Sequence, residues 1–180
     1  MKCAVRSARC AVRSARCAVV IAVVLAAGAV AAQTRLARIV SLIPAVTEML
    51  FAIGAGDQVV GVSTFDTFPK EATTRTRVGG LFDPNFEAIL TLRPDLVIVY
   101  HSQDELIGRL ARVKIPMFSY RHAGLAEITG TIRALGVRVG RAAQAETLAT
   151  QIERELDAVR QSVAGQPRPR TLLVFGREEG

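Results

Sequence analysis

The sequence predicts an α/β protein built on a parallel sheet, and three observations lead to that prediction. Short apolar runs alternate with apolar stripes of helical period over residues 38–139. One run, Leu96 to Tyr100, is apolar throughout, which is typical of a parallel strand covered on both faces. Residues 141–163 contain neither glycine nor proline. We therefore expect a Rossmann-like N-terminal lobe, then a long helix, then the first strand of a truncated second α/β lobe.

Residues 1–32 have the three parts of a secretory signal peptide. Basic residues come first, namely Lys2, Arg6, Arg9, Arg13 and Arg16, and the apolar run that begins at Cys17 ends in small residues. We expect cleavage after Ala31 or Ala32 and a soluble periplasmic product. The alternative is a retained membrane helix, for which this run is short against the roughly 20 residues of a spanning helix.

The distribution of charge and of cysteines also agrees with a leader over residues 1–32. The chain has 23 basic and 16 acidic residues, and removing the five basic residues of the leader leaves 18 against 16. The basicity therefore belongs mostly to the leader, and the class of nucleic-acid-binding proteins loses its main support. All three cysteines lie at or before Cys17. The exported protein is expected to have no disulfide and no thiol ligand.

The first elements follow the leader directly. Residues 38–42 predict a strand, and the apolar stripe of Val46, Met49, Leu50 and Ile53 predicts a helix that begins near Pro44 and ends at Gly54. Residues 59–63 predict a second strand. Residues 64–80 are polar without periodicity, so we expect a long loop there.

The next elements continue the alternation. Asp83 as N-cap and Pro84 in the first turn predict a helix, and residues 96–100 form the third strand. Ser102 and Glu105 fit a capping box for the following helix. A fourth strand over residues 115–120 and a further helix marked by the stripe Ile128, Ile132, Leu135 and Val139 complete the lobe.

The stripe Leu148, Ile152, Leu156, Val159 and Val163 then predicts one helix of roughly 33 Å at 1.5 Å per residue. Residues 171–176 predict a new strand. The expected division is a signal peptide (1–32), an N-terminal α/β lobe (33–140), a linker helix (141–164) and the start of a second lobe (165–180).

Parallel strands place their carboxyl ends at one edge, where ligands bind in open α/β sheets. The segments expected there are 43–47, 64–68, 79–83, 100–102 and 120–122. An enzyme is disfavoured, because Gly54 and Gly56 lie between a helix and a strand rather than between a strand and a helix. No other nucleotide-binding or nucleophile motif is present in the sequence.

At this point the sequence resembles a known family. The segments "RIVSLIPAVTEMLFAIGAGDQVVGVS" (38–63) and "VGG…NFEAILTLRPDLVIVYH" (78–101), with the long helix before a new strand, are similar to periplasmic binding proteins of ABC importers for iron–siderophores, haem and vitamin B12. The resemblance implies two lobes joined by a rigid backbone helix, with a metal chelate in the cleft between them. It also implies a monomer without a cofactor of its own, whose partners are a permease and its ATPase.

The resemblance further implies site residues. Glu87 matches the acidic residue that meets permease arginines, and the alternative is a solvated glutamate favoured by the helix dipole. The implied ligand-binding residues are Pro44, Phe65, Leu81, Phe82, Tyr100, His101 and Arg121. Leu81 stands where the vitamin B12 receptor has a tryptophan, a residue absent from this chain, which counts against cobalamin itself.

Several of these residues have alternative interpretations. The aromatic faces of Phe65, Phe82 and Tyr100 suit a macrocycle or a catechol ring, or the rings turn inward as core. Tyr100 or His101 could ligate haem iron, and Arg121 could pair with an anionic siderophore. The alternative for His101 and Arg121 is that they are solvated surface residues. Two other functions stay open: a stand-alone small-molecule sensor on the same fold, and a truncated, inactive receptor fragment.

Overall fold

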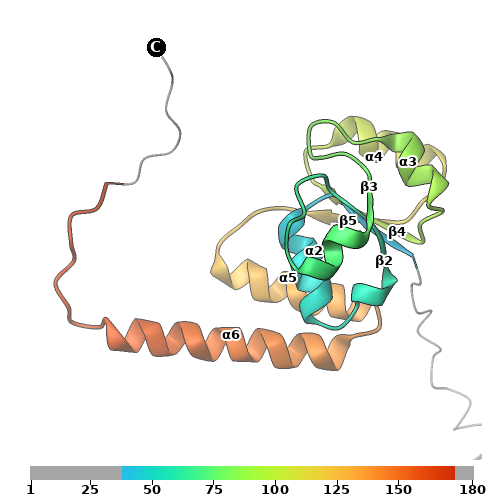
Figure 1. Ribbon diagram of the computed structural model, residues 1–180. Helices are drawn as coiled ribbons and strands as arrows, with labels where there is room; N and C mark the ends of the chain where they lie inside the picture. The colour runs from blue at the N-terminus through green and yellow to red at the C-terminus, as the bar shows by residue number, and fades with distance from the viewer. Residues whose placement is uncertain (1–37, 173–180) are drawn as a thin grey trace, which may run out of the picture. The chain divides into compact units, whose positions relative to one another are not determined.

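A parallel sheet of five strands lies at the centre of the computed structural model, which describes residues 38–172 (Figure 1). The order is β3-β2-β1-β4-β5, and each neighbouring pair is parallel. The strands are β1 (Ile39–Ser41), β2 (Val59–Val62), β3 (Thr76–Arg77), β4 (Leu96–Tyr100) and β5 (Met117–Tyr120). The predicted α/β class with a parallel sheet is confirmed, and all carboxyl ends meet at one edge.

Helices cover both faces of this sheet. They are α2 (Pro44–Ala52), α3 (Phe86–Thr91), α4 (Asp104–Arg112), α5 (Leu125–Arg138) and α6 (Ala142–Ser162), with short 3-10 turns η1 (Gly56–Gln58) and η2 (Lys70–Thr74). Alternate residues of β4 enter two separate cores, since Leu96 and Ile98 face the α2, α5 and α6 side while Val97 and Val99 face the α3 and α4 side. This two-sided burial is why the strand is apolar throughout.

The sequence prediction missed the edge strand β3. Residues 64–80 were expected to be a loop, but they contain η2 and β3. β3 pairs with β2 through Gly61–Thr76 and Val62–Arg77. Both of its residues are polar, and the strand is held by backbone pairing and by hydrogen bonds from the side chain of Arg77, so no apolar pattern marks it in the sequence.

Two predicted helix starts are wrong by one or two residues. Asn85, not Asp83, is the N-cap of α3, and its side chain accepts a hydrogen bond from the N–H of Ala88 at 2.9 Å. Asp83 instead accepts a bond from the N–H of Gly80 at 3.0 Å, closing the preceding turn. The capping box also fails, because Gln103 occupies the N-cap of α4 and Ser102 is exposed. By contrast, α2 ends as predicted, next to Gly54 with its positive φ of 74°.

Helix α6 is continuous, as predicted, and spans roughly 32 Å at 1.5 Å per residue. Its first half packs on α5 and buries Ala145 and Ala149. The predicted stripe is only partly buried, because Val159 and Val163 are exposed. Within residues 38–172, no helix has both the length and the apolar character needed to cross a membrane.

Several predictions concern residues that the structure does not describe. The signal peptide over residues 1–32, with its three cysteines, lies outside the described residues. Most of the strand predicted over residues 171–176 also lies outside them, and its first two residues are not in regular structure.

Candidate functional site

An apolar hollow of about 240 Å³ opens at the carboxyl ends of β1, β4 and β5. The turn from β1 into α2 supplies one wall, and it is fixed by Thr47, whose hydroxyl donates to Ser41 Oγ at 2.9 Å. Pro44 follows as the first residue of α2, where a missing N–H costs nothing. The lining residues are Leu42, Ile43, Pro44, Ala45, Leu81, Tyr100, Tyr120 and His122. The hollow thus brings together three predicted site residues, Pro44, Leu81 and Tyr100.

Tyr120 and His122 also line this hollow. They lie in segment 120–122, which was expected at this edge, but neither was among the predicted ligand-binding residues. Tyr120 pairs with Tyr100 in the sheet register, and the ring centroids lie 6.2 Å apart. His122 follows two residues later, and its Nδ1 lies 3.4 Å from the hydroxyl of Tyr120. The period of two along an extended chain would have placed residues 120 and 122 on one face. The missing information was the register between β4 and β5.

Burial controls the chemistry of Tyr120. The side chain is almost fully buried, and this burial, followed by the neighbouring Tyr100, raises the pKa of the Tyr120 phenol. With no metal bound, the phenol therefore stays protonated at neutral pH and offers a hydrogen-bond donor. Within the described residues 38–172, no group of three or more His, Cys, Asp or Glu side chains is placed to hold a metal ion.

His101 is placed differently from His122. Both histidines are exposed, but His101 is not among the lining residues of the apolar hollow, although its ring lies against Tyr100 with centroids 4.7 Å apart. Arg121, which lies between Tyr120 and His122 in the sequence, is also exposed. Of the two histidines, His122 is the one that faces the hollow.

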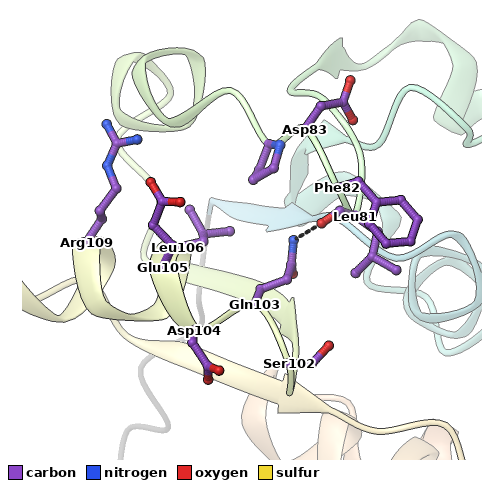
Figure 2. A pocket seen from close by; sticks show the side chains of 10 residues that line it. Leu81, Phe82, Asp83, Ser102, Gln103, Asp104, Glu105, Leu106 and Arg109 are labelled. Carbon is purple, nitrogen blue, oxygen red and sulfur yellow. Dashed lines mark hydrogen bonds between the residues drawn. The ribbon is translucent and has the colours of Figure 1, made fainter.

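A second, larger hollow of about 430 Å³ lies beside the first and shares Leu81 with it (Figure 2). Gln103 joins its two sides, since its Nε2 donates to the carbonyl of Leu81 at 2.9 Å and its Oε1 accepts from the N–H of Tyr100 at 2.8 Å. Its rim is more polar and carries the carboxylates of Asp83, Asp104 and Glu105. A flat apolar ligand therefore fits the smaller hollow better, in spite of the difference in volume.

Two phenylalanines stand exposed near these hollows. Phe82, at the rim of the larger hollow, is 94% exposed, and Phe65 is 68% exposed. The ring of Phe65 lies against Gly80, where a Cβ atom would come within 2.7 Å of Phe65 Cε2. The alternative that these two rings turn inward as core is therefore wrong, whereas Tyr100 is half-buried.

Glu87 lies in the first turn of α3, with a side chain that is 79% exposed. One carboxylate oxygen lies 3.0 Å from Arg109 Nη2, and the guanidinium of Arg109 stacks over the ring of Phe86 at 3.9 Å. The carboxylate is thus accessible, yet it already has a partner in α4. Among the described residues only one oxygen of Glu87 has a hydrogen-bond donor, so the second oxygen can accept from another donor.

Comparison with known proteins adds to this geometry. A family model described as periplasmic binding protein matches residues 39–180. A vitamin B12-binding protein of Pectobacterium carotovorum subsp. carotovorum is 31% identical over 145 residues, which are 78% of this chain and 52% of that protein. The chain therefore spans about half the length of the curated relatives that it matches.

Solved structures give the same picture. The periplasmic vitamin B12 binding protein of Vibrio cholerae superposes with a TM-score of 0.68 and 29% identity, covering 73% of this chain and 52% of that one. A periplasmic heme-binding protein from Roseiflexus sp. RS-1 superposes with a TM-score of 0.66 and 29% identity, with the same coverage of both chains. Proteins that bind different chelates are thus similar to this chain to nearly the same degree.

Proposed function

The chain belongs to the periplasmic binding protein family, and from this premise we propose that it takes up a metal chelate for an ABC importer. The ligand class is a cobamide, haem or an iron–siderophore, because relatives named for vitamin B12 and for heme are about equally similar. The single observation that supports the proposal best is the apolar hollow at the carboxyl ends of β1, β4 and β5. This edge is where ligands meet open α/β sheets.

The residues of the hollow suit one face of a flat chelate. Pro44, Leu81 and Tyr100 are among the residues that line it. Phe82, which lines the neighbouring hollow, and Phe65, which lies against Gly80, offer exposed rings. Aromatic faces stack on conjugated rings at little entropic cost. His101 and Arg121 lie further out, where they can meet polar substituents of the ligand. His122 presents the imidazole nearest to a metal held over this hollow.

The hollow is small, so this surface alone can bind a chelate only weakly. As an example, a one-sided contact that covered about 150 Å² of apolar surface would contribute roughly 4 kcal/mol. That free energy corresponds to a dissociation constant of about 1 mM, before the entropic cost of binding is subtracted. A receptor that works at lower concentrations therefore needs a second surface on the other face of the chelate. The cleft between two lobes that the family resemblance implies would supply it.

The partners and the compartment follow from the same proposal. Glu87 would receive an arginine of the permease through its open carboxylate oxygen, in place of or beside Arg109. The receptor would work as a monomer in the periplasm after removal of residues 1–32. Pairing between exposed charges is weak in isolation, so this contact would act together with a larger docking surface.

Equilibrium dialysis of the 180-residue chain tests the binding proposal. Cyanocobalamin, haemin and a ferric hydroxamate are each offered at up to millimolar concentration. We expect one chelate to be retained by the protein and Phe82→Ala to weaken its retention, whereas Val159→Ala, an equally exposed apolar change on α6, has no effect. The proposal would be refuted if Phe82→Ala and Val159→Ala weakened retention equally, or if none of the three chelates were retained by this chain, with an intact far-UV circular dichroism spectrum, when the second lobe implied by the family resemblance is supplied.

A further inference from the structure

The turn that carries Phe65 is built around a buried carboxyl group. Phe65 is 68% exposed, whereas the next residue, Asp66, is fully buried. A buried carboxyl group is costly unless hydrogen bonds compensate it. Asp66 Oδ2 accepts such a bond from the N–H of Ser63 at 2.8 Å, and Ser63 Oγ accepts one from the N–H of Phe65 at 3.2 Å. The side chain of Asp66 therefore holds the start of the turn in which Phe65 lies.

Arg77 of the edge strand β3 closes the same turn from the other side. Its Nη1 donates to the carbonyl of Ser63 at 2.6 Å and to the carbonyl of Asp66 at 2.7 Å. One guanidinium group thus binds both ends of the turn. Charge-assisted bonds of this kind are stronger than bonds between neutral groups. The position of Arg77 depends in turn on the pairing of β3 with β2.

We propose that Asp66 and Arg77 are positioning residues, which together keep the ring of Phe65 at the rim of the strand ends. That this ring contacts a ligand rests on the proposed function, but the positioning itself does not. Phe65 lies on the bare backbone of Gly80, and the N–H of Thr64 donates to the carbonyl of Gly79 at 2.9 Å. The ring is therefore held between the turn and the loop that also contributes Leu81 to the hollow.

The environment of Asp66 makes this arrangement sensitive to pH. Burial raises the pKa of Asp66 above 3.8, and the charge of Glu48 adds to the rise. The hydroxyl of Thr47, the N–H of Ser63 and the charge of Arg77 oppose it. Asp66 Oδ1 is buried without a hydrogen-bond partner among the described residues. Protonation at that oxygen would therefore break no existing bond, but it would weaken the acceptor at Oδ2.

A single-tryptophan reporter tests the proposal without any ligand. The chain contains no tryptophan, so the emission of a Phe65→Trp variant comes from the turn alone when it is excited at wavelengths that Tyr100 and Tyr120 do not absorb. Adding Asp66→Ala or Arg77→Met is expected to lower the fluorescence anisotropy and increase quenching by acrylamide, with the far-UV circular dichroism unchanged. Asp66→Asn keeps an oxygen acceptor and is expected to restore the anisotropy at neutral pH.

The pH profile separates positioning from general stability. The emission of Phe65→Trp should shift in a transition above pH 3.8 that Asp66→Asn abolishes and Glu48→Gln retains. The proposal is overturned by unchanged anisotropy in folded Asp66→Ala and Arg77→Met chains, or by an equal transition in Asp66→Asn. If the alanine variant does not fold, the pH profiles of Phe65→Trp with and without Asp66→Asn decide alone. Failure of every chelate to bind would refute the proposed function but leave these readings unchanged.

Discussion

Replacing Gly136 by alanine is expected to separate α6 from α5 and to destabilise the lobe. Gly136 is buried in α5 where the helix meets α6. A Cβ atom at this position would overlap the Cβ of Ala145 and would stand 3.0 Å from the carbonyl oxygen of Arg141. Both obstacles belong to backbone or to an atom next to it, so no flexible side chain can move aside.

Two opposing effects determine how much Gly136→Ala changes the free energy of unfolding. Alanine is better than glycine in a helix by about 1 kcal/mol. Overpacking a close-packed interior costs about 1–3 kcal/mol, and an overlap with a rigid Cβ belongs at the upper end. The expected net loss for Gly136→Ala is about 2 kcal/mol. The loss would come from the α5–α6 contact, because Ala145 and Ala149 are the fully buried side chains of α6.

Urea denaturation followed by circular dichroism measures this loss, and Gly130→Ala provides the matched control. Gly130 lies in the same helix, and a Cβ atom there meets nothing within 4 Å. That variant should therefore gain up to about 1 kcal/mol from helix propensity alone. The two changes are chemically identical and should move the denaturation midpoint in opposite directions. Equal midpoints for Gly136→Ala and Gly130→Ala would refute the packing argument.

Two further predictions concern charged residues. Hydrogen bonds from Arg133 lower the pKa of Glu153 from 4.5 to about 2, so the stability that this pair contributes is present above pH 4.5 and is lost as the pH falls toward 2. Glu153→Gln should lose less stability than the parent chain in that window, and parallel losses in urea titrations would contradict this. Glu87→Ala should reduce chelate transport in a reconstituted importer without changing chelate binding. Arg109→Met keeps the carboxylate of Glu87 and should not reduce transport. Equal transport by the two variants would reject the docking role of Glu87.

How well the sequence predicts each element depends on what holds that element. Strand β4 was predicted with its observed bounds and helix α6 to within two residues, because buried side chains fix them and leave an apolar pattern. Strand β3 was missed because only its backbone joins the sheet. The N-caps of α3 and α4 were misplaced because several neighbouring polar residues could cap, and tertiary contacts decide among them. Gln103 serves β4 and the loop of Leu81 in addition to its place at the start of α4.

The candidate site shows the same division. That the strand ends and the loop of Leu81 meet could be predicted, because parallel topology alone requires a common edge. Which side chains face the hollow could not, since that depends on register. Tyr100 and Tyr120 are paired and His122 lines the hollow with them, while His101 does not, although both histidines are exposed. The role of Asp66 was equally hidden, because its partner Arg77 lies on the strand that the sequence did not reveal.

One apolar core connects the hollow to helix α6. The cluster on the α2, α5 and α6 side of the sheet contains Tyr120 together with Ala145 and Ala149. Because such interiors are close-packed, the buried face of α6 and the end of β5 belong to one packed unit. Arg133 adds a fork of hydrogen bonds to Glu146 and Glu153 across the same contact. The first half of α6 is therefore fixed relative to the hollow, while the second half, with Val159, is exposed. A body attached to that second half would keep a constant relation to the hollow, which is the geometry that a receptor with a rigid spine requires.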